Sequence, residues 1–282
     1  MLSEETLDWL VGNEADLSFR RRVRTIFEWL DPQDGDHLLD GGCGRGFYLK
    51  FVRHVSGCRL TGLELEYPFL RIARAALRDS DISLVNGSLY TLPFPDDTFD
   101  KIILSEVLEH LADDVRALRE VVRVLKPGGL VAITVPNENY PFWWDPLNKT
   151  LETLFDAPIR RGLLAGIWAN HMRLYGRERL RGVAEGAGLE VLAERSFTHY
   201  CMPFTHNVVY GFGKTVLEAG VLPGQMAAVA DRHHLGEDDG GPLNPVKIGL
   251  RLLEFFDRRN VMDEPPERST VNLCLKGRKP HV

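Results

Sequence analysis

A glycine-rich turn is the first part of the sequence whose residues suit ligand binding. It spans Asp40–Gly46 and reads DGGCGRG after a short apolar run. Glycines at such a turn let the backbone approach a ligand closely, and the N–H groups at the start of the next helix then face that ligand. The spacing of Gly42, Gly44 and Gly46 departs from the Gly-x-Gly-x-x-Gly fingerprint of dinucleotide sites, and the sequence has no P-loop motif. The turn therefore disfavours both NAD and nucleoside triphosphates.

A second group of residues could take up a proton or hold a metal ion. Glu106, Glu109 and His110 are spaced i, i+3 and i+4, which puts them on one face of a helix if a helix begins directly after the preceding strand. His171 stands further along the chain. Two carboxylates and an imidazole grouped in this way suit a divalent metal, and each of the four side chains could accept the proton of a hydroxyl group. The alternative is structural: His110 packs or caps, and His171 lies in the core.

Alternating strands and helices would position both groups. Apolar runs and turn residues predict strands at 37–40, 59–64, 82–86, 99–104, 130–135, 189–197 and 270–276, with helices at 46–55, 68–78, 113–125 and 177–188. This alternation is typical of a parallel sheet. Ligands bind beyond the carboxyl ends of such strands, so the glycine turn and the Glu106–His110 segment are expected at one edge of the sheet.

The glycine turn resembles the first motif of the class I S-adenosylmethionine-dependent methyltransferases, Asp-x-Gly-x-Gly-x-Gly after strand one, and matches it completely. Residues 92–100, 105–111 and 125–129 are also similar to that family, in its order. The resemblance implies an α/β, Rossmann-like fold with helices on both faces of a mostly parallel seven-stranded sheet, and S-adenosyl-L-methionine as the cofactor. The cofactor-binding residues that it implies are Asp40, Gly41, Gly42, Gly44, Gly46, Glu64, Leu65, Ser88, Leu89 and Ser105.

The resemblance also implies individual roles. Asp40 and the glycines would shape the methionine end of the cofactor site, and Glu64 would bind both ribose hydroxyls, since a carboxylate can accept two bonds at once. Ser88 and Leu89 would contact the adenine. Ser88 stands where the family often has aspartate, so the backbone N–H of Leu89 is the more dependable contact. Further along, the Glu-x-x-Glu-His pattern is similar to that of metal-assisted O-methyltransferases.

Two insertions are expected to form a lid over the core. The predicted division is a helical segment at 1–35, a cofactor-binding core at 36–136, a first lid insertion at 137–175, core again at 176–197, a second lid insertion at 198–268 and a last strand with a tail at 269–282. The insertions carry many aromatic residues, including the Trp143-Trp144 pair, Tyr210 and Phe212. These rings line an apolar acceptor pocket or, equally, form the small core of the lid.

Composition limits the remaining classes of function. The net charge is −6 and 44% of residues are hydrophobic, which disfavours broad nucleic-acid binding. Four cysteines without paired spacing indicate neither a zinc site nor disulfides. The acidic amino terminus lacks the apolar region of a signal peptide, so a cytoplasmic location is expected. Two amphipathic stretches could rest on a membrane surface: 151–168 with Arg160 and Arg161, and 208–230 with Lys214.

The expected function is methyl transfer to a hydroxyl group of an apolar small molecule or lipid-like acceptor, with His110, His171 and Glu106 as catalytic candidates. Amine and carbon acceptors stay open. One alternative is a metal-assisted O-methyltransferase that uses Glu106, Glu109 and His110, with His171 as a distant fourth ligand. Another is a protein that binds the cofactor without catalysis.

Overall fold

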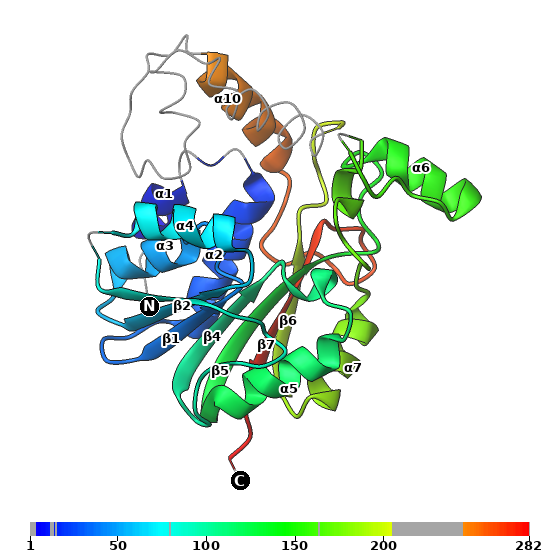
Figure 1. Ribbon diagram of the computed structural model, residues 1–282. Coiled ribbons are helices and arrows are strands. Elements are labelled where there is room, and N and C mark those ends of the chain that lie inside the picture. Colours follow the sequence, from blue (N-terminus) through cyan, green and yellow to red (C-terminus); the bar gives the residue numbers. More distant parts are fainter. Residues whose placement is uncertain are drawn as a thin grey trace.

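A seven-stranded sheet forms the centre of the structure, a computed structural model that describes residues 4–11, 14, 16–78, 80–162, 164–204 and 245–281 (Figure 1). The strand order is β3-β2-β1-β4-β5-β7-β6. All pairs are parallel except those of β7, which runs antiparallel to both β5 and β6. The bounds are β1 His37–Gly41, β2 Arg59–Glu64, β3 Ile82–Asn86, β4 Phe99–Ser105, β5 Leu125–Pro136, β6 Glu190–Phe197 and β7 Asn272–Arg278. The predicted fold class is confirmed.

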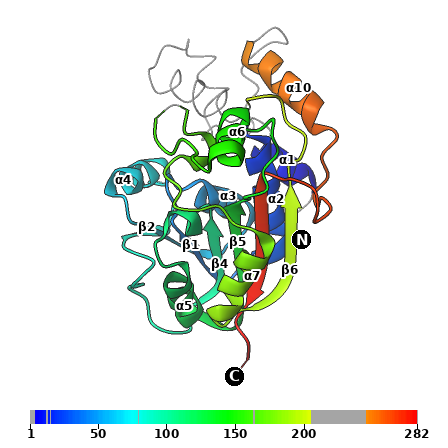
Figure 2. The same ribbon diagram turned by 90° about the vertical axis from the view of Figure 1, so that its right-hand side faces the viewer.

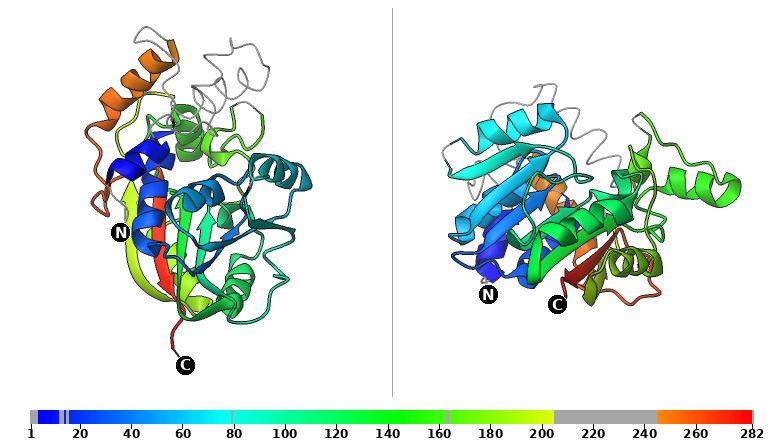
Figure 3. Two further views of the ribbon diagram at one scale, coloured as in Figure 1. Left: turned by 90° about the vertical axis from the view of Figure 1, so that its left-hand side faces the viewer. Right: turned by 60° about the horizontal axis from the view of Figure 1, so that its bottom comes forward.

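Helices cover both faces of this sheet (Figures 2 and 3). Their bounds are α1 Glu4–Val11, α2 Leu17–Leu30, α3 Phe47–Val55, α4 Tyr67–Ala76, α5 Asp114–Val124, α6 Pro146–Phe155, α7 Arg177–Gly186 and α10 Pro245–Asp257, with short 3-10 turns η1 Leu108–His110 and η2 Gly166–Trp168. Successive strand residues point to opposite faces. Ile102 accordingly packs in the cluster formed with α5 and α7, whereas Ile103 packs in the cluster formed with α1, α2 and α3.

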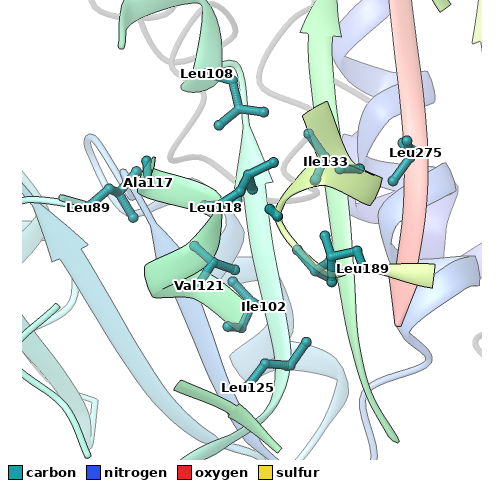
Figure 4. Packing of buried hydrophobic residues seen from close by; sticks show 14 of the residues in the cluster. Leu89, Ile102, Leu108, Ala117, Leu118, Val121, Leu125, Ile133, Leu189 and Leu275 are labelled. Carbon is teal, nitrogen blue, oxygen red and sulfur yellow. The ribbon is translucent and has the colours of Figure 1, made fainter. Parts of the chain in front are cut away.

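The α5 layer shows how the sequence pattern produces this packing (Figure 4). Leu118 and Val121, three residues apart on α5, are fully buried with Ile102 of β4 and Ile133 of β5. The helix begins where the Asp113 side chain accepts a hydrogen bond from the N–H of residue 116 at 2.9 Å, as expected of an N-terminal cap. Burial of this apolar face fixes the helix over β4, and thereby fixes the segment between them that carries Glu106–His110.

One expectation about local structure is wrong. No helix begins directly after β4: Glu106 has a left-handed φ of 56°, and only the 3-10 turn η1 follows. The amphipathic stretch at 151–168 is helical only in its first part, because α6 ends at Phe155, where Asp156 takes a left-handed conformation and caps it. The segment then continues irregularly to η2. The chemistry of the Glu106 segment must therefore be derived from its own geometry.

Part of the second predicted insertion is described. Residues 198–204 follow β6, and α10 packs beside α2 through Arg20–Glu254 at 3.2 Å and Arg21–Asp257. The stretch 208–230, with Tyr210, Phe212 and Lys214, lies outside the described residues, as does the acidic loop at 237–241. Among the described residues, no helix is both long and apolar enough to cross a membrane.

Candidate functional site

The glycine turn lies on the end of β2 and leaves one side open. The N–H groups of Gly42 and Cys43 both donate to the carbonyl of Leu63, at 2.8 and 3.0 Å. Gly42 has a φ of +78°, and a Cβ there would lie 2.7 Å from the Val107 side chain, so glycine is required. Gly44 has a φ of +53°, and its Cβ would meet no atom of the described residues within 4 Å. The backbone at Gly44 therefore borders space that a ligand can approach closely.

Asp40 and Glu64 lie beside this turn at the carboxyl ends of adjacent strands. Glu64 accepts hydrogen bonds from the N–H groups of Gly44 and Glu66, both at 2.8 Å. A carboxylate has about four acceptor positions, so lone pairs remain for two hydroxyl groups. Asp40 is 2% exposed, and its Oδ2 has no hydrogen-bond partner among the described residues. Burial and the charge of Glu64 raise the pKa of Asp40 to about 8. Unpartnered buried acceptors are rare, and this one suits a donor group of a ligand.

The residues expected at the adenine follow β3 and lie next to Glu64. The Asn86 side-chain amide donates to the carbonyls of Glu64 and Leu65, at 2.8 and 2.9 Å, and so joins the two strand ends. Leu65 itself is 61% exposed. The Ser88 hydroxyl accepts from the N–H two residues on at 3.2 Å, and Leu89 is buried in the core. Leu89 would therefore contact a ligand through its backbone, and Ser88 would do so through its backbone and the remaining lone pair of its hydroxyl group.

A chain of hydrogen bonds runs behind the glycine turn. The pairs are Tyr48 Oη with Ser105 Oγ at 2.9 Å, Ser105 Oγ with Thr134 Oγ1 at 2.9 Å, and Thr134 Oγ1 with Glu106 Oε1 at 3.0 Å. An ionised carboxylate only accepts, so Thr134 donates to Glu106. It follows that Ser105 donates to Thr134 and that Tyr48 donates to Ser105. Ser105, expected at the cofactor, therefore has one acceptor lone pair left.

Glu106 is held by positive and polar groups from distant segments. Arg22 of α2 pairs with its Oε2 at 2.8 Å, and the Asn272 amide of β7 donates to both carboxylate oxygens at 3.2 Å. Ser18 of α2 bonds to Asn272 in turn. These contacts occupy both carboxylate oxygens of Glu106. Glu106 therefore fastens α2 to the sheet, and the expected helix face shared with Glu109 and His110 does not form. Neither Arg22 nor Asn272 was expected at the site from the sequence.

Glu109, His110 and His171 do come together. Their ligating atoms all lie within 4.8 Å of one another, and the two imidazole rings are 4.8 Å apart. Glu109 is fully buried, and neither of its carboxylate oxygens has a hydrogen-bond partner among the described residues. The nearest nitrogens are the Nε2 atoms of His110 and His171, at 3.8 and 3.9 Å, beyond hydrogen-bond range. Burial and the charge of Glu106 raise the pKa of Glu109 well above its ordinary value.

Backbone contacts set the orientation of this cluster. His110 Nδ1 is 3.1 Å from the carbonyl of Asn170. A carbonyl can only accept, so Nδ1 carries the hydrogen, and Nε2 of a neutral His110 is the basic nitrogen, aimed toward Glu109. The N–H of Met172 donates to the carbonyl of Glu109 at 2.8 Å. Together these two bonds fasten the His171 segment of the first insertion to η1.

Known proteins share this sequence pattern. Residues 39–133 match the model of a family described as methyltransferase domain. A demethylmenaquinone methyltransferase of Listeria welshimeri is 33% identical over 141 residues, which are 47% of this chain and 60% of the relative. Over residues 39–133 the chain is therefore similar to a methyltransferase domain, which supports the resemblance to the class I S-adenosylmethionine-dependent methyltransferases. Methyltransferase GfsG of Streptomyces halstedii is 32% identical over 117 residues, 40% of this chain and 42% of the relative. The chain thus spans less than two thirds of these curated methyltransferases.

Solved structures share the fold over most of the chain. The cyclase SpnF superimposes with a TM-score of 0.55 at 21% identity, covering 93% of this chain and 82% of SpnF. An S-adenosylmethionine-dependent methyltransferase from Mesorhizobium loti gives a TM-score of 0.51 at 17% identity, covering 95% of this chain and 99% of the other. At these identities the likeness concerns the methyltransferase fold alone. A cyclase among the neighbours illustrates that one fold supports several reactions.

Proposed function

We propose that the chain transfers the methyl group of S-adenosyl-L-methionine to a hydroxyl group of an apolar small molecule or lipid-like acceptor. The observation that carries this proposal is the pair of acids at the glycine turn. Asp40 brings a buried carboxylate oxygen with no partner among the described residues, and Glu64 keeps free lone pairs beside it. The open backbone at Gly44 adds room for the cofactor. This donor and acceptor set fits a charged amino acid joined to a ribose.

The cofactor, when bound, supplies an electrophilic methyl group on a sulfonium centre. The chain's own residues hold and orient the cofactor. Asp40 and the glycine turn bind the amino-acid end, and Glu64 accepts the ribose hydroxyls. Fixing two reactants in line is worth effective molarities of ~10⁵ M or more, so positioning supplies most of the acceleration. No covalent intermediate with the protein is needed.

His110 and His171 serve as the proton acceptors for a hydroxyl substrate. The hydrogen bond to Asn170 makes Nε2 of His110 basic, and the His110 side chain is 42% exposed, within reach of a ligand, whereas His171 is 15% exposed. Glu106 is not the base in this mechanism, because Arg22 and Asn272 occupy its oxygens. Its role is instead structural, since it joins α2 to β7 through Arg22 and Asn272.

Replacing Glu64 with alanine tests the cofactor site. Loss of a charged acceptor costs roughly 1.5–3 kcal/mol, so affinity for S-adenosylhomocysteine should fall about tenfold to a hundredfold, measured by isothermal titration. Glu66→Ala is the matched control, because Glu66 contributes only its backbone N–H to this site. Equal affinity in Glu64→Ala and the wild type, with both folded, would remove Glu64 from the site.

Transfer of a labelled methyl group tests the reaction itself. The wild-type chain is incubated with labelled S-adenosyl-L-methionine and a panel of hydroxylated apolar compounds. Because the Listeria relative is named for demethylmenaquinone, quinone-type compounds head the panel. Label is expected in an organic extract with the wild type and much less with His110→Ala. Tight cofactor binding with no transfer to any compound or to a cell extract would favour the non-catalytic alternative.

A metal-assisted reaction is a second candidate, and one observation favours it. The buried Glu109 carboxylate faces two imidazole Nε2 atoms at 3.8 and 3.9 Å, and ligands about 2.1 Å from one ion lie roughly 3–4 Å apart. His110 also donates its other nitrogen to a backbone carbonyl, as metal-bound histidines do. Two imidazoles with one carboxylate suit zinc or another transition metal more than Mg²⁺. The predicted set changes accordingly, with His171 in place of Glu106.

Chelation distinguishes the two mechanisms. If a metal acts here, excess chelator should abolish transfer, and Mn²⁺ or Zn²⁺ should restore it. Elemental analysis should find about one ion per chain, lost in Glu109→Gln and in His171→Ala. His54→Ala is the control, since His54 lies exposed on α3, where its Nδ1 bonds to the Lys50 carbonyl and its ring lies 5.8 Å from that of Trp9. Full activity in chelator, with no bound metal, would leave His110 and His171 as proton acceptors alone.

A further inference from the structure

The inner face of helix α10 packs against the domain and forms ion pairs with α2. Leu253 is 8% exposed. Glu254 pairs with Arg20 at 3.2 Å, and Asp257 accepts from Arg21 through both carboxylate oxygens. Residues 253, 254 and 257 share one side of a helix with 3.6 residues per turn. Both acids of the helix therefore lie on the side of α2, and their ion pairs join α10 to α2.

The outer face of α10 carries a different set of side chains. Ile248, Leu252 and Phe255 follow at i, i+4 and i+7, and are 51%, 50% and 58% exposed. Such spacing places them in one stripe along the helix. Three exposed cationic residues adjoin the stripe: Arg251, Arg258 and Arg259. In the part of the chain that the structure describes, none of the three forms an ion pair.

This distribution of charge is unusual for the molecule. The chain as a whole has a net charge of −6, yet the described outer face of α10 presents arginines and no acid. Just beyond the helix, Glu264 is 2% exposed and the exposed Asp263 accepts from the N–H of Ser196. An apolar stripe with a purely basic border is complementary to a surface that is anionic outside and apolar within.

The end of the first insertion repeats this combination. Leu154 and Phe155 at the end of α6 are 66% and 68% exposed, and the exposed Arg160 and Arg161 follow them. Figures 1 and 2 show α6 and α10 beyond the same end of the sheet, the end at which the candidate site lies. Two separate segments thus bring apolar and basic groups to one end of the molecule.

We propose that the outer face of α10 docks on the surface of an anionic lipid bilayer. Leu252 and Phe255 enter the boundary between headgroups and acyl chains, as in other interfacial amphipathic helices, and the arginines pair with headgroup phosphates. The inner ion pairs keep the helix attached to the domain while its outer face is in the membrane. This inference does not depend on the methyl-transfer proposal, because docking requires neither cofactor nor acceptor.

Vesicle co-sedimentation of the full chain tests the proposal. With phosphatidylcholine vesicles containing about a third phosphatidylglycerol, the wild type should pellet at low salt, bind weakly to pure phosphatidylcholine, and be released as ionic strength rises. Leu252→Glu/Phe255→Glu should abolish binding. Arg258→Gln/Arg259→Gln should weaken it about 25-fold, at about fivefold for each arginine. Cofactor titration and melting curves confirm that each variant is folded.

Matched control variants distinguish binding through the outer face of α10 from nonspecific binding to vesicles. Leu192→Glu changes an exposed leucine on the edge strand β6, 39% exposed, and should bind like the wild type. Arg181→Gln/Arg278→Gln removes the same charge from α7 and β7 and should also bind normally. Equal binding to neutral vesicles, or unaltered binding of Leu252→Glu/Phe255→Glu, would overturn the proposal. So would a wild-type dimer that the same variant makes monomeric without any vesicle binding, because the stripe would then pair two copies.

Discussion

Asp40→Asn is expected to stabilise the folded chain at neutral and alkaline pH and to weaken cofactor binding at the same time. Burial and the charge of Glu64 raise the pKa of Asp40 to about 8, from an ordinary 3.8. Between these values the folded state binds one proton more than the unfolded state, so the contribution of Asp40 to the free energy of unfolding falls as pH rises from about 4 to 8. Asparagine does not titrate and avoids this loss.

The measurement is urea unfolding at several pH values from 5 to 9. The stability difference between Asp40→Asn and the wild type should grow with pH and level off above about 8, reaching several kcal/mol at about 1.4 kcal/mol per pH unit. At pH values above about 8, where the wild-type Asp40 is ionised, affinity for S-adenosylhomocysteine should fall about tenfold or more, because asparagine carries no charge to meet the cofactor's amino group. Asp81→Asn, on the surface, is the control. Parallel pH curves for Asp40→Asn and the wild type would show that Asp40 is already ionised in the fold.

Trp144→Ala should unfold the first insertion, whereas Trp143→Ala should leave stability almost unchanged. Trp144 is 4% exposed and packs in a cluster with Tyr140, Trp168 and Val271, while Trp143 is 56% exposed. Removing a buried tryptophan costs about 3–5 kcal/mol, and an exposed one typically costs within about 0.5 kcal/mol. The exposed Trp143 therefore serves as the matched control for the buried Trp144.

Thermal or urea unfolding gives the stability of each variant, and steady-state turnover with an identified acceptor gives its effect on catalysis. Trp143→Ala should raise KM for an apolar acceptor while cofactor affinity stays constant. If Trp143→Ala and Trp144→Ala lower stability equally, both rings belong to the core of the insertion. The sequence could not separate them, because aromatic neighbours in an irregular segment carry no periodicity from which burial can be inferred.

Features that depend on short stretches of chain were predicted well. The bounds of Arg59–Glu64 and Ile82–Asn86 agree with β2 and β3, since turn residues mark the limits of both runs in the sequence. The glycine turn and Glu64 were placed correctly for the same reason. β5 was predicted to begin at residue 130 and begins at Leu125, because Phe99 pairs with Leu125 before a register shift that the Pro127–Gly129 sequence conceals.

Features that depend on distant contacts were not predictable. Glu106 was placed on a helix by its spacing, but it has a left-handed φ of 56°, and its carboxylate is bound by Arg22 and Asn272. Those two partners come from segments far apart in the chain, and neither carries a local pattern that indicates the meeting. Single-sequence periodicity describes which face of an element is apolar, and it contains no information about which polar side chains converge in space.

The position of β7 also has a consequence for how the protein is made. This strand lies between β5 and β6 in the sheet, although β6 ends at Phe197 and β7 begins only at Asn272. On the ribosome, β5 and β6 therefore emerge long before the strand that joins them, and each keeps an unpaired edge meanwhile. The same strand carries Asn272, which bonds to Glu106 and to Ser18 of α2. Helix α2 therefore gains this anchor only after β7 has been synthesised. Such non-local pairing slows folding and exposes strand edges to other chains. Coexpression with chaperones should therefore raise the soluble yield.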